Sequence, residues 1–196
     1  MQGGRPKMRL LALAGSTRDG SLNAALLAVI LDELAGDGFD IDRVDYALFE
    51  DTPQYSARRE ATDGVPPAMR ALARRITDAT AQVWVTPEYN HGIPGSMKNG
   101  IDWLSRISPG LMALKPTLIA GASAAPYGAW RAMRALRPAL ELMGALTLPY
   151  MISVGGVRGE ADIRARFADP EARAKIDAAL AALRHQARLA RPQPGG

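Results

Sequence analysis

Hydrogen-bond donors crowd residues 14–27, AGSTRDGSLNAALL, where an apolar run gives way to a predicted helix. The donors are the hydroxyls of Ser16, Thr17 and Ser21, the guanidinium of Arg18 and the amide of Asn23. Unpaired backbone N–H groups and a partial positive charge at a helix N-terminus attract anions. The segment therefore predicts a phosphate site, with simple helix capping by Ser21 or Asn23 as the alternative.

The same segment lacks the lysine of G-x-x-x-x-G-K-[ST] and the spacing of G-x-G-x-x-G. A nucleoside triphosphate and the pyrophosphate of a dinucleotide are therefore disfavoured. A loop this short suits a single phosphate group.

A second stretch that could hold a ligand is TPEYNHGIPGSMKNGIDWLSR, residues 86–106. Pro87 ends a predicted strand, and Gly92 and Gly95 let the backbone approach a ligand closely. The polar and aromatic residues that could surround a planar ring are Glu88, Tyr89 and Asn90. The loop therefore predicts a site for a ring system such as a flavin, which needs backbone donors around its edge.

The helix that follows this loop carries both charged and apolar side chains. Lys98 and Asp102 are four residues apart, which predicts an ion pair on the helix surface, with a subunit contact as the alternative. The apolar residues Met97, Ile101 and Trp103 lie beside the polar residues Lys98 and Asn99. This mixed surface is larger than one core can cover, so we expect a second subunit to pack here. For Tyr89, packing is the alternative to a contact with the ring, and for Trp103 packing is the preferred interpretation.

Protein groups able to carry out redox or nucleophilic chemistry are scarce. The chain has no cysteine, which excludes disulfides, thiolate metal sites and cysteine nucleophiles together. The chain has two histidines: His185 is expected at a surface, and His91 is not required for hydride transfer. A hydrolase with a catalytic triad, which needs a histidine as its base, is therefore disfavoured. We predict no catalytic side chain and no metal, and any redox chemistry must be carried by a bound cofactor.

Five apolar or alternating segments predict strands. They are MRLLALAG, FDIDRV, AQVWVT, PTLIAGAS and TLPYMISV. Apolar residues at helical spacing separate them, in residues 21–36, 65–79, from 95 or 96 onward, around 133–143 and after 169. The polar segment at 49–64 is interpreted as a loop.

Three prolines mark expected boundaries. Pro138 should kink or end its helix near Arg137, because it lacks an N–H and crowds the preceding turn. Pro149 places the fifth strand at a sheet edge or lies at its first residues. Asp169 should cap the last helix, with Pro170 in its first turn.

Alternating strands and helices predict an α/β protein with a mostly parallel sheet in three layers. Such sheets bind ligands at the carboxyl ends of their strands, where the strand order reverses. The loops after the first, third and fourth strands are therefore the candidate site.

Length and composition narrow the class of protein. The 196 residues, of which 47% are hydrophobic, predict one domain over 1–196 with frayed ends at about 1–7 and 191–196. The 24 Lys and Arg residues are interspersed with 20 Asp and Glu, so nucleic-acid binding is a minor alternative. Without a long apolar run or a signal peptide, we expect a cytoplasmic protein with no membrane partner.

Three segments together resemble a known family. GSTRDGSLN, PEYNHGIPGSMKNGIDWLS and SAAPYGAWRAMRALRPAL are similar to the NADPH-dependent FMN reductases, a group that includes chromate reductases, quinone reductases and some azoreductases. The match covers roughly residues 8–155. The resemblance implies a flavodoxin-like three-layer sandwich whose five-stranded parallel sheet has the order 2-1-3-4-5.

The resemblance also implies cofactor-binding residues. Those expected around the FMN phosphate are Ser16, Arg18, Ser21, Leu22 and Asn23, and those expected along the isoalloxazine are Pro87, Glu88, Tyr89, Asn90 and Gly92. Ser123 of the third loop also matches. The family pattern has glycines near Ala125 and Ala129, so the extra methyl groups are expected to alter the substrate pocket. The flavin of the family lies near a subunit interface, which implies a homodimer or homotetramer.

The predicted function is that of an FMN-dependent NAD(P)H oxidoreductase with a ping-pong mechanism, acting on quinones, azo compounds, flavins or metal oxyanions such as chromate. The choice between NADPH and NADH stays open, as does the natural acceptor. The rival is a flavodoxin-like electron carrier or flavin-binding regulatory protein without turnover. Carriers of that kind tend to be acidic, whereas this chain has a net charge of +4.

Overall fold

The computed structural model describes residues 7–190, so the predicted frayed ends lie outside it except for Lys7. At its centre is a sheet in the order β2-β1-β3-β4-β5, with β6 also paired to β4, and every pairing is parallel. The strands are β1 Met8–Ala14, β2 Phe39–Val44, β3 Ala81–Val85, β4 Pro116–Ser123, β5 Leu146–Thr147 and β6 Ile152–Gly155. The predicted fold class and strand order are confirmed.

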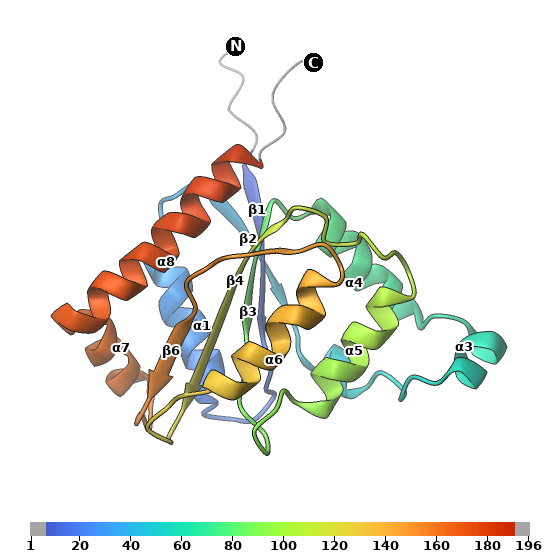
Figure 1. Cartoon of the computed structure of the whole chain (residues 1–196), viewed down its shortest axis with the longest axis horizontal. Coiled ribbons are helices and arrows are strands. Elements are labelled where there is room, and N and C mark those ends of the chain that lie inside the picture. Colours follow the sequence, from blue (N-terminus) through green and yellow to red (C-terminus); the bar gives the residue numbers. More distant parts are fainter. Residues whose placement is uncertain (1–6, 191–196) are drawn as a thin grey trace, which may run out of the picture.

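Helices cover both faces of the sheet (Figure 1). Helices α1, α7 and α8 pack on one face, and α4, α5 and α6 pack on the other. The helices are α1 Leu22–Glu33, α2 Ala47–Glu50, α3 Ala57–Asp63, α4 Pro67–Asp78, α5 Gly95–Ser105, α6 Trp130–Glu141, α7 Glu160–Ala168 and α8 Pro170–Leu189. None of the helices within residues 7–190 is both long and apolar enough to cross a membrane.

The apolar runs of the central strands follow from this layering. In β1, Leu10 and Ala12 face the core under α1 and α8, whereas Leu11 and Leu13 face the core under α4 and α5. A strand buried on both faces has no polar side to alternate with its apolar side. The sequence pattern of β1 therefore reports its central place in the sheet.

The fifth predicted strand is divided at Pro149. Leu146 pairs with Pro116 near the start of β4, and Ile152 pairs with Ala120 in its second half. Pro149 lies between the two pieces, at the edge of the sheet. No hydrogen bond between strands requires an N–H at this position, so proline is tolerated there. The prediction of an edge strand is confirmed.

Of the two outcomes predicted for Pro138, a kink or an end of the helix near Arg137, the early end is wrong. Helix α6 continues through Pro138 to Glu141, and the N–H of Leu142 donates to the Pro138 carbonyl at 3.0 Å. Both Pro138 and Arg134, whose carbonyl loses its partner, are exposed. Water can satisfy that carbonyl, so the proline costs less here than it would on a buried face.

The polar segment 49–64 is more ordered than predicted. It includes the end of α2 and the whole of α3, and α3 begins where the Ser56 side chain accepts from the N–H of Arg59. None of the α3 residues is buried, so local capping rather than an apolar face marks this helix. The predicted cap of the last helix is confirmed, because Asp169 accepts from the N–H groups of Glu171 and Ala172.

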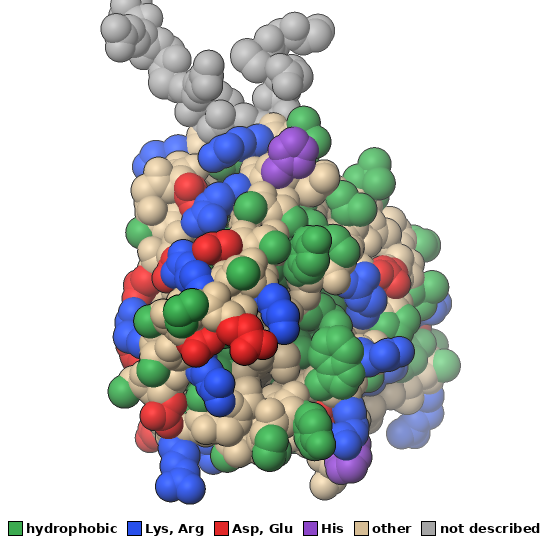
Figure 2. Space-filling model, turned by 60° about the vertical axis from the view of Figure 1, so that its left-hand side comes forward, with side chains coloured by type: hydrophobic (Ala, Val, Ile, Leu, Met, Phe, Trp, Pro, Cys, Tyr) green, Lys and Arg blue, Asp and Glu red, His purple; other side chains and the backbone are tan. Residues whose placement is uncertain are grey.

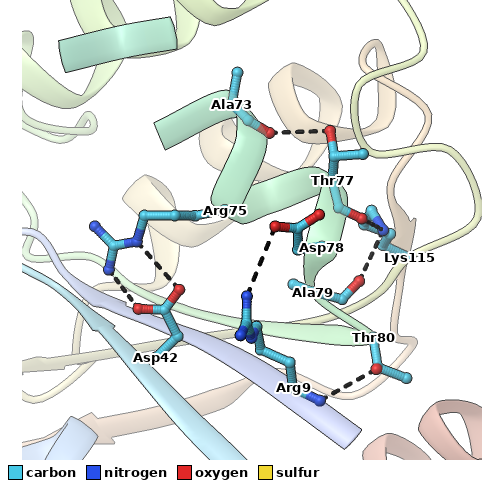
Figure 3. Close-up of polar contacts among 9 residues, drawn as sticks. All are labelled: Arg9, Asp42, Ala73, Arg75, Thr77, Asp78, Ala79, Thr80 and Lys115. Atoms are coloured by element: carbon cyan, nitrogen blue, oxygen red, sulfur yellow. Dashed lines mark hydrogen bonds and ion pairs between the residues drawn. The ribbon is translucent and has the colours of Figure 1, made fainter. Parts of the chain in front are cut away.

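Charged side chains fasten α4 to the sheet (Figure 3). Arg75 forms two hydrogen bonds to the Asp42 carboxylate of β2, with Nη2 at 2.6 Å and Nε at 3.1 Å. The amino group of Lys115 donates to the carbonyls of Thr77 and Ala79 at the end of α4. Partial burial lowers the pKa of Lys115. These contacts fix the end of α4 from which β3 enters the sheet.

Candidate functional site

The loop after β1 is held tightly against the loop after β3. The N–H of Gly15 donates to the Val85 carbonyl at 2.8 Å. A Cβ on Gly15 would lie 2.5 Å from Met97 Cε and 3.1 Å from Pro87 Cδ, so only glycine fits without displacing them. The carboxyl ends of β1 and β3 therefore meet at one edge of the sheet, beside the start of α5 (Figure 1).

Several hydrogen-bond donors of the first loop are available for an anion. The Ser16 hydroxyl accepts from the N–H of Arg18 and the Ser21 hydroxyl accepts from the N–H of Ala24, so both O–H groups can still donate. The guanidinium of Arg18 is exposed and has no hydrogen bond or ion pair to any other residue of 7–190. Thr17 differs, since its hydroxyl donates to the Glu50 carboxylate at 2.8 Å.

Asn23 has a structural task that the sequence did not indicate. Its side chain is buried, donates to the Ala122 carbonyl at 3.1 Å and accepts from the Ala122 N–H at 2.9 Å. Asn23 thereby joins α1 to β4, and one of its amide hydrogens remains for another acceptor. Leu22, the residue before it, is half-buried and packs against the core under α1.

The loop after β3 contains a tight two-residue turn. The N–H of Tyr89 donates to the Gly92 carbonyl at 2.9 Å, and the N–H of Gly92 donates back to the Tyr89 carbonyl at 3.0 Å. Between them Asn90 and His91 have φ angles of 49° and 66°, a left-handed conformation that hairpin turns of this kind require. A histidine in that conformation is uncommon and marks a constrained backbone. All four residues of the turn are exposed or half-buried, so the turn projects from the edge of the sheet.

Glu88 fixes this turn to α6. Its carboxylate accepts from the backbone N–H of Arg131 at 2.9 Å and of Ala132 at 3.3 Å. It also accepts from the Arg131 guanidinium at 3.3 Å, and its side chain is only 12% exposed. The N-cap residue of α6, Ala129, has no side-chain acceptor, so a residue from another loop supplies the cap.

The loop after β4 completes the edge. The Ser123 hydroxyl accepts from the N–H of Ala125 at 3.1 Å and keeps its own hydrogen for donation. The Ala129 methyl is buried, 2.6 Å from where a Cβ on Gly121 would lie, whereas Ala125 is exposed. Of the two alanines expected near a ring, only Ala125 lies on the surface of this loop.

The three loops that the sequence singled out therefore lie together. Gly15 joins the first to the second, Glu88 joins the second to the third through α6, and Asn23 joins α1 to the end of β4 at Ala122. The exposed aromatic residues of the second and third loops and of the start of α6 are Tyr89, Tyr127 and Trp130. Within residues 7–190 no cluster of His, Cys, Asp or Glu could hold a metal ion.

The reasoning that led to a second subunit at α5 is wrong. Met97, Ile101 and Trp103 are all buried in the core of their own chain, and Trp103 donates from Nε1 to the Pro53 carbonyl. Burial in the core of their own chain leaves almost no apolar surface exposed on these three side chains. The predicted ion pair between Lys98 and Asp102 is present.

At the carboxyl ends of the strands, the first loop offers hydroxyl, guanidinium and backbone donors, and the loop after β3 offers a constrained turn with an aromatic residue. The exposed His91 has no hydrogen-bonded carboxylate within residues 7–190 to orient it. The arrangement can bind and orient an anionic ring compound, and its side chains provide no acid–base dyad.

Comparisons with known proteins agree with this geometry. The sequence profile of the family described as "NADPH-dependent FMN reductase" matches residues 8–158. The chain is 36% identical over 151 residues to a quinone reductase of Escherichia coli (strain K12), covering 77% of this chain and 79% of that protein. It is 34% identical over 178 residues to the NAD(P)H-dependent FMN reductase PA1204 of Pseudomonas aeruginosa, covering 90% and 93% of the two chains.

Solved structures show the same architecture. The flavoenzyme FerB of Paracoccus denitrificans, an NAD(P)H:(acceptor) oxidoreductase, superposes with a TM-score of 0.69 at 26% identity, covering 90% of this chain and 98% of that one. An NADH:FMN oxidoreductase in its apo form superposes with a TM-score of 0.65 at 19% identity, covering 91% and 89%, and supports the fold alone.

Proposed function

The chain belongs to the NADPH-dependent FMN reductase family and is an oxidoreductase that uses FMN and NAD(P)H, and from that membership we propose that it reduces quinones. The observation that carries the proposal is the contact of Gly15, in the donor-rich first loop, with Val85 and Pro87, which lead into the constrained Tyr89–Gly92 turn. The proposed reaction consumes NAD(P)H, a proton and a quinone, and yields NAD(P)⁺ and a hydroquinone.

The phosphate of FMN fits the first loop. The guanidinium of Arg18 and the hydroxyls of Ser16 and Ser21 would hold it, together with the backbone N–H groups of Leu22 and Asn23 in the first turn of α1. Hydroxyls that already accept a backbone hydrogen bond are oriented, so little entropy is lost when they donate to the phosphate. Asn23 contributes mainly by fixing the end of α1 to β4, and the spare hydrogen of its amide is a further donor.

The isoalloxazine would lie between the second and third loops. Pro87, Tyr89, Asn90 and Gly92 would line it from one loop, and Ser123 from the other. Glu88, which resemblance implied as a ring contact, would act by holding its loop on α6. Bound FMN supplies two-electron chemistry, accepting a hydride and returning electrons to an acceptor. The protein's task is to orient the ring, and the constrained turn limits how the backbone can move against it.

We also propose ping-pong kinetics, in which nicotinamide and acceptor occupy the same face of the ring in turn. The support is the single edge at which the three loops meet and the lack of any thiol in the chain. Azo compounds and metal oxyanions such as chromate are proposed as further acceptors, since electron release from a flavin does not require a specific protein acid. Parallel double-reciprocal lines at several quinone concentrations are expected, and intersecting lines would contradict a shared site.

Assembly as a homodimer or homotetramer remains a prediction that the family resemblance alone supports, because the buried Met97, Ile101 and Trp103 no longer favour it. Light scattering decides it: a mass near the 20.9 kDa of one chain at micromolar concentration would exclude both assemblies.

The test of the proposed function is steady-state NADPH oxidation by the FMN-loaded protein with and without a quinone. We expect turnover that depends on both the quinone and FMN. The rival, an electron carrier without turnover, predicts a protein that binds FMN but does not oxidise NADPH catalytically when a quinone is present.

A further inference from the structure

A cavity of about 450 Å³ lies beside the free edge of β6, and of the three loops described above only the loop after β4 borders it. Its floor is β6, one wall is the end of α7 with the first turns of α8, and the other wall is the start of α6 with the loop before it. The side chains that matter for a ligand are Trp130, Met151, Arg166, Asp169, Glu171 and Lys175. Figure 2 shows the face of the molecule that carries α7 and α8, where a hollow separates hydrophobic side chains from charged ones.

The cations of this cavity differ from three other arginines of α7 and α8. Arg164, Arg173 and Arg184 all form ion pairs with carboxylates of α1 or the loop that follows it. Arg166 and Lys175 form no hydrogen bond or ion pair with any other residue of 7–190, although both border the cavity. Two cations free to pair with a ligand on one side of a cavity favour a compact anion such as a phosphate.

The two carboxylates of the cavity, Asp169 and Glu171, differ in whether they already have hydrogen-bond partners. Asp169 is committed to the N-cap of α8, where Oδ1 accepts from the N–H groups of Glu171 and Ala172. Glu171 makes no side-chain hydrogen bond within residues 7–190 and is a free acceptor. Free acceptors beside free cations suit a ligand that carries hydroxyl groups as well as a phosphate.

The opposite wall offers an aromatic surface. Trp130 is 44% exposed, whereas Trp84 and Trp103 are fully buried. The guanidinium of Arg134 lies 6.0 Å from the centre of the Trp130 ring, and Met151 also borders the cavity. A planar base could stack on this indole or lie against the thioether.

The position of the cavity relates it to the proposed reaction. Two of its lining residues are Pro126, in the segment between β4 and α6, and Trp130, the first residue of α6; this segment starts directly after Ser123, the last residue of β4. A ligand that crosses this segment would have one end at the three loops and the other in the cavity. The hydride donor of the family has that form, with a nicotinamide at one end and an adenosine at the other.

We propose that this cavity binds the adenosine 2′-phosphate half of NADPH, an inference that rests on the proposed function. Arg166 and Lys175 pair with the 2′-phosphate, Glu171 accepts from a ribose hydroxyl, and the adenine packs against Trp130. The cavity thereby favours NADPH over NADH, because only NADPH has a phosphate for the two cations.

The first test uses adenosine 2′,5′-bisphosphate as the probe and the tryptophan fluorescence of the FMN-saturated protein as the signal. Since Trp130 is the exposed tryptophan of the three, we expect the probe to quench it and 5′-AMP to bind at least tenfold more weakly. Trp130→Phe should abolish the signal, and isothermal titration should still detect binding. Equal affinity for the two compounds, or no binding of either, would overturn the proposal.

Matched variants test the roles of the cations. Arg166→Ala and Lys175→Ala should each weaken the bisphosphate at least tenfold and raise the KM for NADPH more than that for NADH. Arg188→Ala, an exposed arginine near the far end of α8, is the control and should leave both unchanged. If the double variant, Arg166→Ala plus Lys175→Ala, bound adenosine 2′,5′-bisphosphate as tightly as the wild type, the assignment would be contradicted. If the protein did not retain FMN, the proposed function would fail, whereas titration of the flavin-free protein would still test the cavity.

Discussion

Replacing Glu88 with alanine removes a helix cap that comes from a different loop. The carboxylate accepts from the N–H groups of Arg131 and Ala132 in the first turn of α6, and the N-cap residue Ala129 offers no side-chain substitute. Loss of a side-chain cap costs about 1 kcal/mol, and loss of a negative charge at a helix N-terminus costs about 0.5 kcal/mol more.

The ion pair with Arg131 adds little to this sum. The Arg131 side chain is 50% exposed and the pair is separated by 3.3 Å, so we count at most about 0.5 kcal/mol for it. Glu88→Ala should therefore lower the free energy of unfolding by about 2 kcal/mol, and the melting temperature by about 4–8 °C for a chain of this size. Urea denaturation of the FMN-free protein measures the change without a contribution from flavin binding.

Two further variants separate the cap from the ion pair. Glu88→Gln keeps an acceptor oxygen without the charge and should recover about half of the loss. Arg131→Ala leaves both backbone donors capped and should cost less than about 0.5 kcal/mol. The reasoning is refuted if Arg131→Ala is as costly as Glu88→Ala, or if Glu88→Ala unfolds at the same urea concentration as the wild type.

Three other predictions follow from the same structure. Arg18→Ala should weaken FMN binding by about 1.5 kcal/mol, or roughly tenfold, because a charge-assisted hydrogen bond to the phosphate is lost at an exposed position; unchanged FMN affinity in a fluorescence titration would remove Arg18 from the site. His91→Ala should lower kcat/KM by less than about tenfold, since hydride transfer requires no imidazole, and a loss of several orders of magnitude would give His91 a role in the reaction. Burial raises the pKa of Tyr46 from 10.0 to about 12, although the hydrogen bond between its hydroxyl and Ser96 opposes this. The folded protein then holds this proton more tightly than the unfolded chain, so the contribution is complete below pH 10 and is lost as the pH rises toward 12, at up to about 1.4 kcal/mol per pH unit. Tyr46→Phe should lack this alkaline decline in urea denaturation at a series of pH values, and an equal decline in both proteins would contradict it.

The features that sequence could predict are those that depend on periodicity or on short motifs. Apolar runs such as that of β1 are buried on both faces, which only a central parallel strand requires, so the strands and their loops could be located. The loops then follow, because parallel strands bring their carboxyl ends to one edge. Ser16 and Ser21 could be identified as donors because both lie within a few residues of the helix start.

The features that sequence could not predict depend on partners distant in the chain. Asn23 was identified as a ligand or cap, but its amide pairs with the backbone of Ala122, 99 residues away. The assignment of Glu88 to the ring stays a prediction, and the sequence did not reveal that Glu88 caps a helix that begins more than 40 residues later. Met97 was placed at a subunit interface because spacing does not reveal that Gly15 leaves room for its side chain. In each case the residue type indicates what kind of contact the side chain can make. Which residue it contacts depends on the fold and cannot be read from the local sequence.

The central claim, that the three loops hold an FMN which passes electrons from NAD(P)H to a quinone, is tested most directly by the absorption spectrum of the purified, FMN-treated protein without oxygen. We predict flavin bands that remain with the protein after gel filtration, bleach on addition of NADPH and return on addition of a quinone. A protein that emerges colourless, or whose flavin bands do not respond to NADPH, would contradict the account.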